Sequence, residues 1–307
     1  MREPRHYQGE PDLKAMRNLL IAGRKANNGS YYIHSGDLNW WLYFPPLDGD
    51  YWEHIYLWDD PDIPGELLGW ALISPDWVGI DVYIRPDLRG SPPADEMYGW
   101  TEDRATQIAQ RVGKKATNSL WILQNDEVLG NHFTQRGYRL AKGCVQFSRN
   151  LDGTLLPSQV VGEFRVRACR GEDEVDSRAR AQHGAFSSEA PFERYLERFR
   201  KFMRSPVYCH NLDIVATCPN GEIGAFCIIW MDPVNKVGLF EPVGTHPDYQ
   251  RKGLGKAVML EGLRRLQAGG MQQAIVSTGE DNLPAIKLYE KIGFRIVNQL
   301  GTYQKDV

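Results

Sequence analysis

An internal repeat divides this chain of 307 residues into two similar halves. Four pairs of segments match in the same order at separations of roughly 155 to 162 residues. The paired segments begin at Arg5 and Arg167, Gly65 and Gly221, Val82 and Val243, and Phe133 and Tyr289. Such a repeat indicates two tandem copies of one domain. Gly, Pro and Ser residues in 151–162 predict a linker, so we expect domains at 1–150 and 163–307.

Residues 237–260 of the second half predict a strand, a loop and a helix. β-Branched and aromatic residues fill 237–245, and apolar residues recur at helical spacing after Gly255. Between them lies a short loop with two glycines and the basic residues Arg251, Lys252 and Lys256. Glycine lets backbone N–H groups turn inward, and a helix N-terminus adds unpaired donors and a positive dipole end. This stretch therefore predicts a phosphate-binding loop.

The loop fits neither common nucleotide motif, because Val258 replaces the third glycine of the dinucleotide fingerprint and the P-loop spacing is absent. Residues 250–255 (QRKGLG) resemble instead the Gln/Arg-x-x-Gly-x-Gly/Ala loop of the GNAT N-acetyltransferase superfamily. Residues 282–294 (NLPAIKLYEKIGF) resemble the Asn-x-x-Ala-x-x-x-Tyr-x-x-x-Gly-Phe segment of the same superfamily. The resemblance implies an α/β (α+β) fold of two GNAT-like domains, each a mixed, mainly antiparallel sheet flanked by helices.

The resemblance also implies acetyl-CoA as cosubstrate and direct acetyl transfer to a primary amine in a ternary complex. The residues it assigns to acetyl-CoA are Val243, Gly244, Thr245, Gln250, Arg251, Lys252, Gly253, Leu254, Gly255, Lys256 and Asn282. The backbone N–H of Val243 is the expected oxyanion donor, and Asn282 is also expected to cap its helix.

Two catalytic roles are expected in the second half. Tyr289 is the expected general acid, because a phenol of pKa about 10 stays protonated at neutral pH and can protonate a thiolate. A packing tyrosine is the alternative. Glu241 is the expected general base, since strand alternation places it on the face of Val243. The alternative is a solvated glutamate at a strand end that Pro242 interrupts.

The first half is expected to have lost acetyl-CoA binding. Its loop at 86–94 is shorter than its counterpart, Pro92 and Pro93 lack backbone donors, and Phe133 stands where the second half has Tyr289. Aromatic residues cluster at 40–58. They indicate either core packing or one wall of the acceptor site.

Composition excludes several other classes. The net charge of −3 argues against nucleic acid or an anionic membrane as partner, and no paired histidine spacing predicts a metal site. Five scattered cysteines and an N-terminus without an apolar signal core predict a reducing, cytoplasmic setting. We expect a monomer or homodimer acting on a small-molecule amine.

Two alternative functions remain. The tandem layout is similar to that of the mycothiol synthase family, which implies acetylation of an amino-sugar/thiol conjugate. The other alternative is a non-catalytic acyl-CoA-binding or sensor protein.

Overall fold

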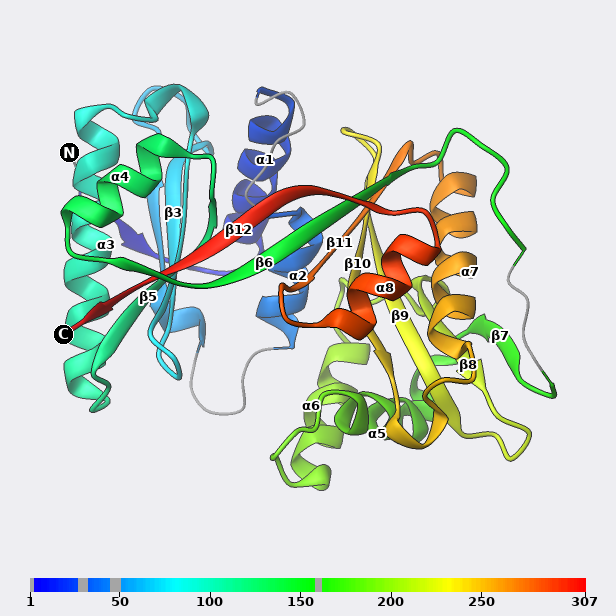
Figure 1. Ribbon diagram of the computed structural model, residues 1–307. Coiled ribbons are helices and arrows are strands. Elements are labelled where there is room, and N and C mark those ends of the chain that lie inside the picture. The colour runs from blue at the N-terminus through cyan, green and yellow to red at the C-terminus, as the bar shows by residue number, and fades with distance from the viewer. Residues whose placement is uncertain (1–2, 27–32, 45–50, 158–161) are drawn as a thin grey trace. The chain divides into compact units, whose positions relative to one another are not determined.

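The computed structural model describes residues 3–26, 33–44, 51–157 and 162–307, and the same succession of elements occurs in it twice (Figure 1). The first half contains β1 (Arg5–His6), α1 (Glu10–Ala26), α2 (Ser35–Tyr43), β2 (Ile55–Asp59), β3 (Leu67–Ser74), β4 (Gly79–Ile84), α3 (Pro92–Arg111), β5 (Ala116–Leu123), α4 (Glu127–Gln135) and β6 (Arg139–Asn150). The second contains β7 (Arg165–Ala168), α5 (Val175–Ala185), α6 (Phe192–Met203), β8 (Asp213–Thr217), β9 (Ile223–Asp232), β10 (Val237–Thr245), α7 (Leu254–Ala268), β11 (Gln273–Gly279), α8 (Leu283–Lys291) and β12 (Arg295–Asp306). The mixed, mainly antiparallel architecture expected from the sequence is confirmed.

The repeat extends to individual ion pairs. Arg5 binds Asp12 at 2.7 Å in the first half, and Arg167 binds Glu174 at 2.6 Å in the second. Each carboxylate also accepts a backbone N–H, from Gln8 and Arg170 respectively. These pairs tie the first strand of each half to the start of the helical region that follows.

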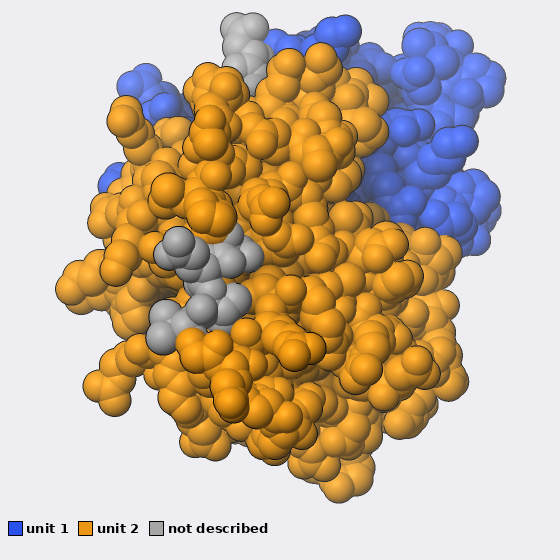
Figure 2. Space-filling model, turned by 90° about the vertical axis from the view of Figure 1, so that its right-hand side faces the viewer, with its two compact units in different colours: residues 1–38, 48–145, 298–307 blue, residues 39–47, 146–297 orange. Residues whose placement is uncertain are grey.

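The chain forms two compact units that are not the two contiguous halves expected from the sequence. Unit 1 comprises residues 1–38, 48–145 and 298–307, and unit 2 comprises 39–47 and 146–297 (Figure 2). The last strand of each half therefore reaches into the unit formed mainly by the other half. Strand alternation shows that a segment joins a sheet but not which strands it pairs with, so this exchange could not be predicted from the strand pattern. Separate roles for 1–150 and 163–307 remain a prediction, and part of the expected linker, 158–161, lies outside the described residues.

Unit 2 is built on a sheet with the strand order β11-β10-β9-β8-β7. Helices cover both faces of β9, because the ring of Phe226 faces Arg178 of α5 while the Cys227 thiol, one residue on, donates to the Val258 carbonyl of α7. Adjacent residues of a strand point to opposite faces, so α5 and α7 lie on opposite sides of the sheet. β9 and its neighbour β10, which also contacts both α5 and α7, are therefore held between two helical layers.

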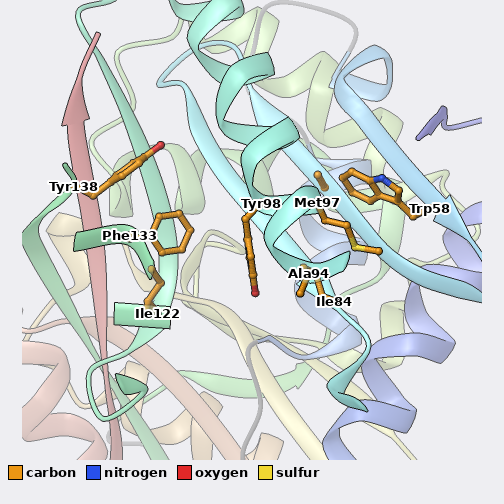
Figure 3. Close-up of a cluster of buried hydrophobic side chains, with 9 residues drawn as sticks. Trp58, Ile84, Ala94, Met97, Tyr98, Ile122, Phe133 and Tyr138 are labelled. Atoms are coloured by element: carbon orange, nitrogen blue, oxygen red, sulfur yellow. The ribbon is translucent and has the colours of Figure 1, made fainter. Parts of the chain in front are cut away.

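Unit 1 has the strand order β1-β2-β3-β4-β5-β12. Its core includes a cluster of buried apolar side chains in which Phe133 of α4 lies between Tyr98 and Tyr138 (Figure 3). Phe133 is 2% exposed, and the ring of Tyr303, from β12, packs beside it with a centroid separation of 6.3 Å. The residue that matches Tyr289 is thus an apolar core residue.

Membrane insertion is not indicated by the helices that the structure describes. None of them combines the length and the apolar character that crossing a bilayer requires.

Candidate active site

Two parallel strands of unit 2 separate where the candidate site lies. β10 and β11 pair at Val237 with Gln273, Gly238 with Ala274 and Leu239 with Ile275. Pairing within these described strands ends there, although β10 continues to Thr245 and β11 to Gly279. Backbone groups on this edge of β10 are therefore left for another hydrogen-bonding chain, and the strand expected at 237–245 is confirmed.

The loop that follows β10 has the backbone geometry of an anion cradle. Arg251 and Gly253 have φ values of +60° and +79°, and α7 begins at Leu254, one residue before the expected start. Among the described residues, no backbone hydrogen bond is made by the N–H groups of 251–256. Successive unpaired N–H groups in such a turn, followed by a helix N-terminus, suit an anion. The residues present therefore fit the pyrophosphate of an acyl-CoA.

Charge distinguishes this loop from its counterpart in unit 1. Within the described chain, Arg251, Lys252 and Lys256 have no carboxylate at ion-pair distance, and the Lys252 Nζ donates only to the Asp248 carbonyl, at 3.1 Å. In unit 1, Arg89 is paired with Asp126, and Arg85 is paired with two carboxylates, those of Asp60 and Asp87. The positive charge of the first loop is thus already neutralised, and that of the second is available to a ligand.

The end of β10, the start of α7 and helix α8 meet at Gly255. A Cβ on Gly255 would lie 3.0 Å from the Thr245 hydroxyl and 3.5 Å from the Leu288 side chain. A larger residue there would push these elements apart, which explains the second glycine of the loop. Thr245, Gly255 and α8 are therefore brought together, as the sequence predicted for a common site.

Asn282 caps α8, as expected. Its Oδ1 accepts the Ala285 N–H at 3.3 Å, and its Nδ2 donates to the Thr278 hydroxyl at the end of β11. Both partners lie outside the loop 250–256. The capping role is thus confirmed, and contact with acetyl-CoA stays a prediction.

Tyr289 lies buried on α8, with 5% of its surface exposed. Burial raises the pKa of its phenol above the ordinary value, and the nearby Glu241 charge raises it further. The phenol therefore stays protonated at neutral pH. Burial and the Glu241 charge therefore act on this phenol in the same direction.

Glu241 lies in an irregular part of β10. The pairing register with β9 shifts between Phe240 and Val243, and the Trp230 Nε1 donates to the Glu241 carbonyl at 2.6 Å. The regular alternation that was expected to place Glu241 and Val243 on one face is therefore interrupted. The Glu241 side chain is half-buried, and its charge is one of the causes that raise the pKa of Tyr289.

Residues of the first half that the sequence did not indicate also support this site. Phe147 of β6 packs on Tyr289 with ring centroids 5.4 Å apart, and Arg149 donates to the carbonyl of Ile292 just after α8. Their alternating strand pattern gave no sign of contact with a helix more than a hundred residues away. Only the exchange of the final strands brings them there.

Other candidate groups near the site are structural. Burial raises the pKa of the Cys227 thiol well above its usual value, and the thiol donates to Val258, so it is not a thiolate nucleophile. His246 packs against α5, since a Cβ on Gly184 would lie 2.4 Å from its ring. In the described part of the chain, no group of three or more His, Cys, Asp or Glu residues could hold a metal ion.

Comparison with known proteins agrees with this geometry. The model of the acetyltransferase (GNAT) family matches residues 176–294. A mycothiol acetyltransferase of Pseudarthrobacter chlorophenolicus is 41% identical over 311 residues, covering 92% of this chain and 88% of the relative. A mycothiol acetyltransferase of an Arthrobacter species is 34% identical, covering 76% and 73%. Among solved structures, a tandem GNAT protein from the clavulanic acid biosynthesis pathway has a TM-score of 0.69 at 12% identity, covering 99% and 97%, which supports the fold alone.

Proposed function

Because the chain belongs to the GNAT acetyltransferase family, we propose that it transfers an acetyl group from acetyl-CoA to a primary amine at the opening between β10 and β11. The observation that carries the proposal is the loop 251–256, with its unpaired N–H groups and uncompensated positive charge at the end of the opening. A pyrophosphate anchored there would direct its pantetheine arm along the unpaired edge of β10.

Transfer proceeds directly between the thioester and the amine. Glu241, acting through a water molecule, takes a proton from the ammonium form of the acceptor, and the nitrogen of the neutral amine then attacks the acetyl carbonyl. The N–H of Val243 stabilises the oxyanion as the C–N bond forms. The C–S bond breaks, and Tyr289 protonates the departing CoA thiolate. The nitrogen loses its second proton, and transfer of a proton through solvent returns Tyr289 to its protonated form. The raised pKa of the Tyr289 phenol supports this role because it keeps the proton in place until the thiolate forms.

The first half contributes no second acetyl-CoA site in this proposal. Pairing of Arg89 with Asp126 and of Arg85 with two carboxylates supports this, as do Pro92 and Pro93 at the first positions of α3. A stoichiometry of one acetyl-CoA per chain follows.

The acceptor is a small amine rather than a nucleic acid or a membrane component. Relatives that match most of the chain are named mycothiol acetyltransferases, which favours the amine of an amino-sugar/thiol conjugate over an unrelated amine. Sequence identity of 34% to 41% supports a shared class of acceptor.

A panel of amines tests this assignment. It contains a cysteinyl amino-sugar conjugate, the same conjugate with its thiol alkylated, an aminoglycoside, and a peptide with a free lysine. Mass spectrometry should detect the acetylated product, since free thiols interfere with thiol-reactive dyes. We expect the highest kcat/KM with the cysteinyl conjugate. Tight acetyl-CoA binding with no acetylation of any amine would contradict the proposed reaction, and a preference for lysine peptide would contradict the acceptor class.

A further inference from the structure

A segment of the first half is built into unit 2. Residues 39–47 belong to that unit, and Phe44, which follows α2 and is 8% exposed, packs against α6. Its ring lies edge-on to Tyr195 and Phe199, with centroids 5.6 Å away in each case, and the Arg198 guanidinium stacks over it at 3.7 Å. These contacts settle the alternatives for the aromatic cluster at 40–58 only in part, because 45–50 lie outside the described residues and Trp58 is in the core of unit 1.

Side-chain contacts connect Tyr195 of α6 to the turn formed by residues 186–190. Tyr195 meets the ring of His183 at a right angle, with centroids 5.0 Å apart, and the His183 Nε2 lies 2.8 Å from the Ala190 carbonyl oxygen. The turn formed by residues 186–190 is closed by backbone bonds from Ser187 to Gly184 and from Ser188 to His183. His183 thus fastens both ends of this turn, and Tyr195 supports His183.

The turn borders the strand that carries the proposed oxyanion donor. A Cβ placed on Gly244 would lie 3.0 Å from Ala185, the residue before the turn. Phe186 lies 6.2 Å from Phe226 between ring centroids, and 52% of its surface is exposed. A large apolar ring is therefore presented to solvent close to Val243 and Gly244.

We propose that Phe44 is a positioning residue that fixes the turn 186–190 and thereby determines recognition of the acceptor. Phe44 acts through Tyr195 and His183, and Phe186 is the apolar surface that the acceptor meets. The inference rests on the proposed function, since it concerns the acceptor of that reaction. In this proposal the first half supports acceptor recognition, a role that requires neither a phosphate-binding loop nor a tyrosine at position 133.

Rigid support matters because a turn that must be ordered when the acceptor binds costs free energy, and this cost weakens acceptor binding. Loss of the Phe44 ring removes one of the aromatic groups that pack on Tyr195 and Arg198, so their support of the turn is weakened and the turn samples other positions. The anchoring of the acetyl-CoA pyrophosphate does not depend on this path, because its proposed loop follows β10 and precedes α7. Substitution of Phe44 should therefore weaken acceptor recognition more than it weakens acetyl-CoA binding.

The test uses the full chain with Phe44→Ala and Phe44→Leu, and with Phe133→Leu as the matched control. Phe133 is also a buried phenylalanine, but it lies in unit 1, away from this path. We expect the acceptor kcat/KM, measured with the amine that wild type acetylates best, to fall about tenfold in Phe44→Leu and about a hundredfold in Phe44→Ala. The loss should appear mainly in KM, while the acetyl-CoA Kd changes less than about twofold.

Hydrogen exchange supplies a second measurement that needs no acceptor. Amides of residues 186–190 should exchange about tenfold faster in both Phe44 variants than in wild type, and at the wild-type rate in Phe133→Leu. Phe44 variants that match the control in both KM and exchange would overturn the inference. If wild type acetylates no amine, the proposed function fails, and the exchange rates alone decide whether Phe44 positions the turn.

Discussion

Replacing Gly253 by proline should abolish acetyl-CoA binding while leaving the chain folded. Gly253 has a φ of +79°, whereas proline holds φ near −65° and lacks an N–H. The substitution therefore removes one donor directly and turns the neighbouring donor at Leu254 away. A hydrogen bond to a charged group contributes about 1.5 to 3 kcal/mol. Loss of two of them weakens binding by about 3 to 6 kcal/mol, which is a factor of roughly one hundred or more in Kd.

Alanine at the same position separates backbone conformation from steric effects. Apart from its neighbours in the chain, no heavy atom of the described residues lies within 4 Å of a Cβ placed on Gly253, so the methyl group has room. Its cost is the left-handed conformation, about 1 to 2 kcal/mol of stability. Gly253→Ala should therefore lower Tm by a few degrees and leave acetyl-CoA affinity within about threefold of wild type.

Unit 1 provides the matched control for the proline substitution. Gly90 also precedes the N-terminal region of a helix, with a φ of +72°, and the Val128 side chain lies 3.9 Å from its Cβ position. Calorimetry should find one acetyl-CoA per chain in wild type and in Gly90→Pro, and no binding in Gly253→Pro. Unchanged affinity in Gly253→Pro, or a second site that Gly90→Pro removes, would refute the assignment of binding to the second loop alone.

Three further predictions concern single side chains. Tyr289→Phe should lower kcat by roughly tenfold to a thousandfold with unchanged acetyl-CoA affinity, and normal turnover of this variant would exclude the acid role. Because burial raises the pKa of the Tyr289 phenol, deprotonation of Tyr289 should not lower the wild-type kcat below about pH 9. Glu241→Gln should lower kcat/KM about a hundredfold and remove the acidic limb of its pH profile, so a retained limb would point to another base. Burial acts to raise the pKa of Glu174, but hydrogen bonds from Arg167 and from a backbone N–H lower it to about 2, below the ordinary 4.5. The stability that this carboxylate contributes is therefore present above about pH 4.5 and lost as the pH falls toward 2. The urea midpoint of Glu174→Gln should drop less between pH 5 and pH 3 than that of wild type, and an equal drop would contradict the link between this pKa and stability.

Much of the site was predictable from the residues alone because its chemistry is local. The strand at 237–245, the glycine loop, the helix after it and the cap at Asn282 each depend on neighbours within a few positions, and the structure confirms all four. Glycine at 253 is required by a backbone angle, and an asparagine before α8 by an unpaired N–H. Interactions between residues a few positions apart can be predicted from the local sequence.

The supporting contacts depend on the tertiary structure instead. Phe147 reaches Tyr289, and Phe44 reaches Tyr195, because segments of the first half are incorporated into unit 2. A strand records its two faces in its alternation but not the identity of its partner, and the irregular register at Glu241 is equally invisible in the sequence. Pairing over more than a hundred residues is decided by which complete arrangement buries the apolar faces of both sheets, a property of the whole chain rather than of any one segment.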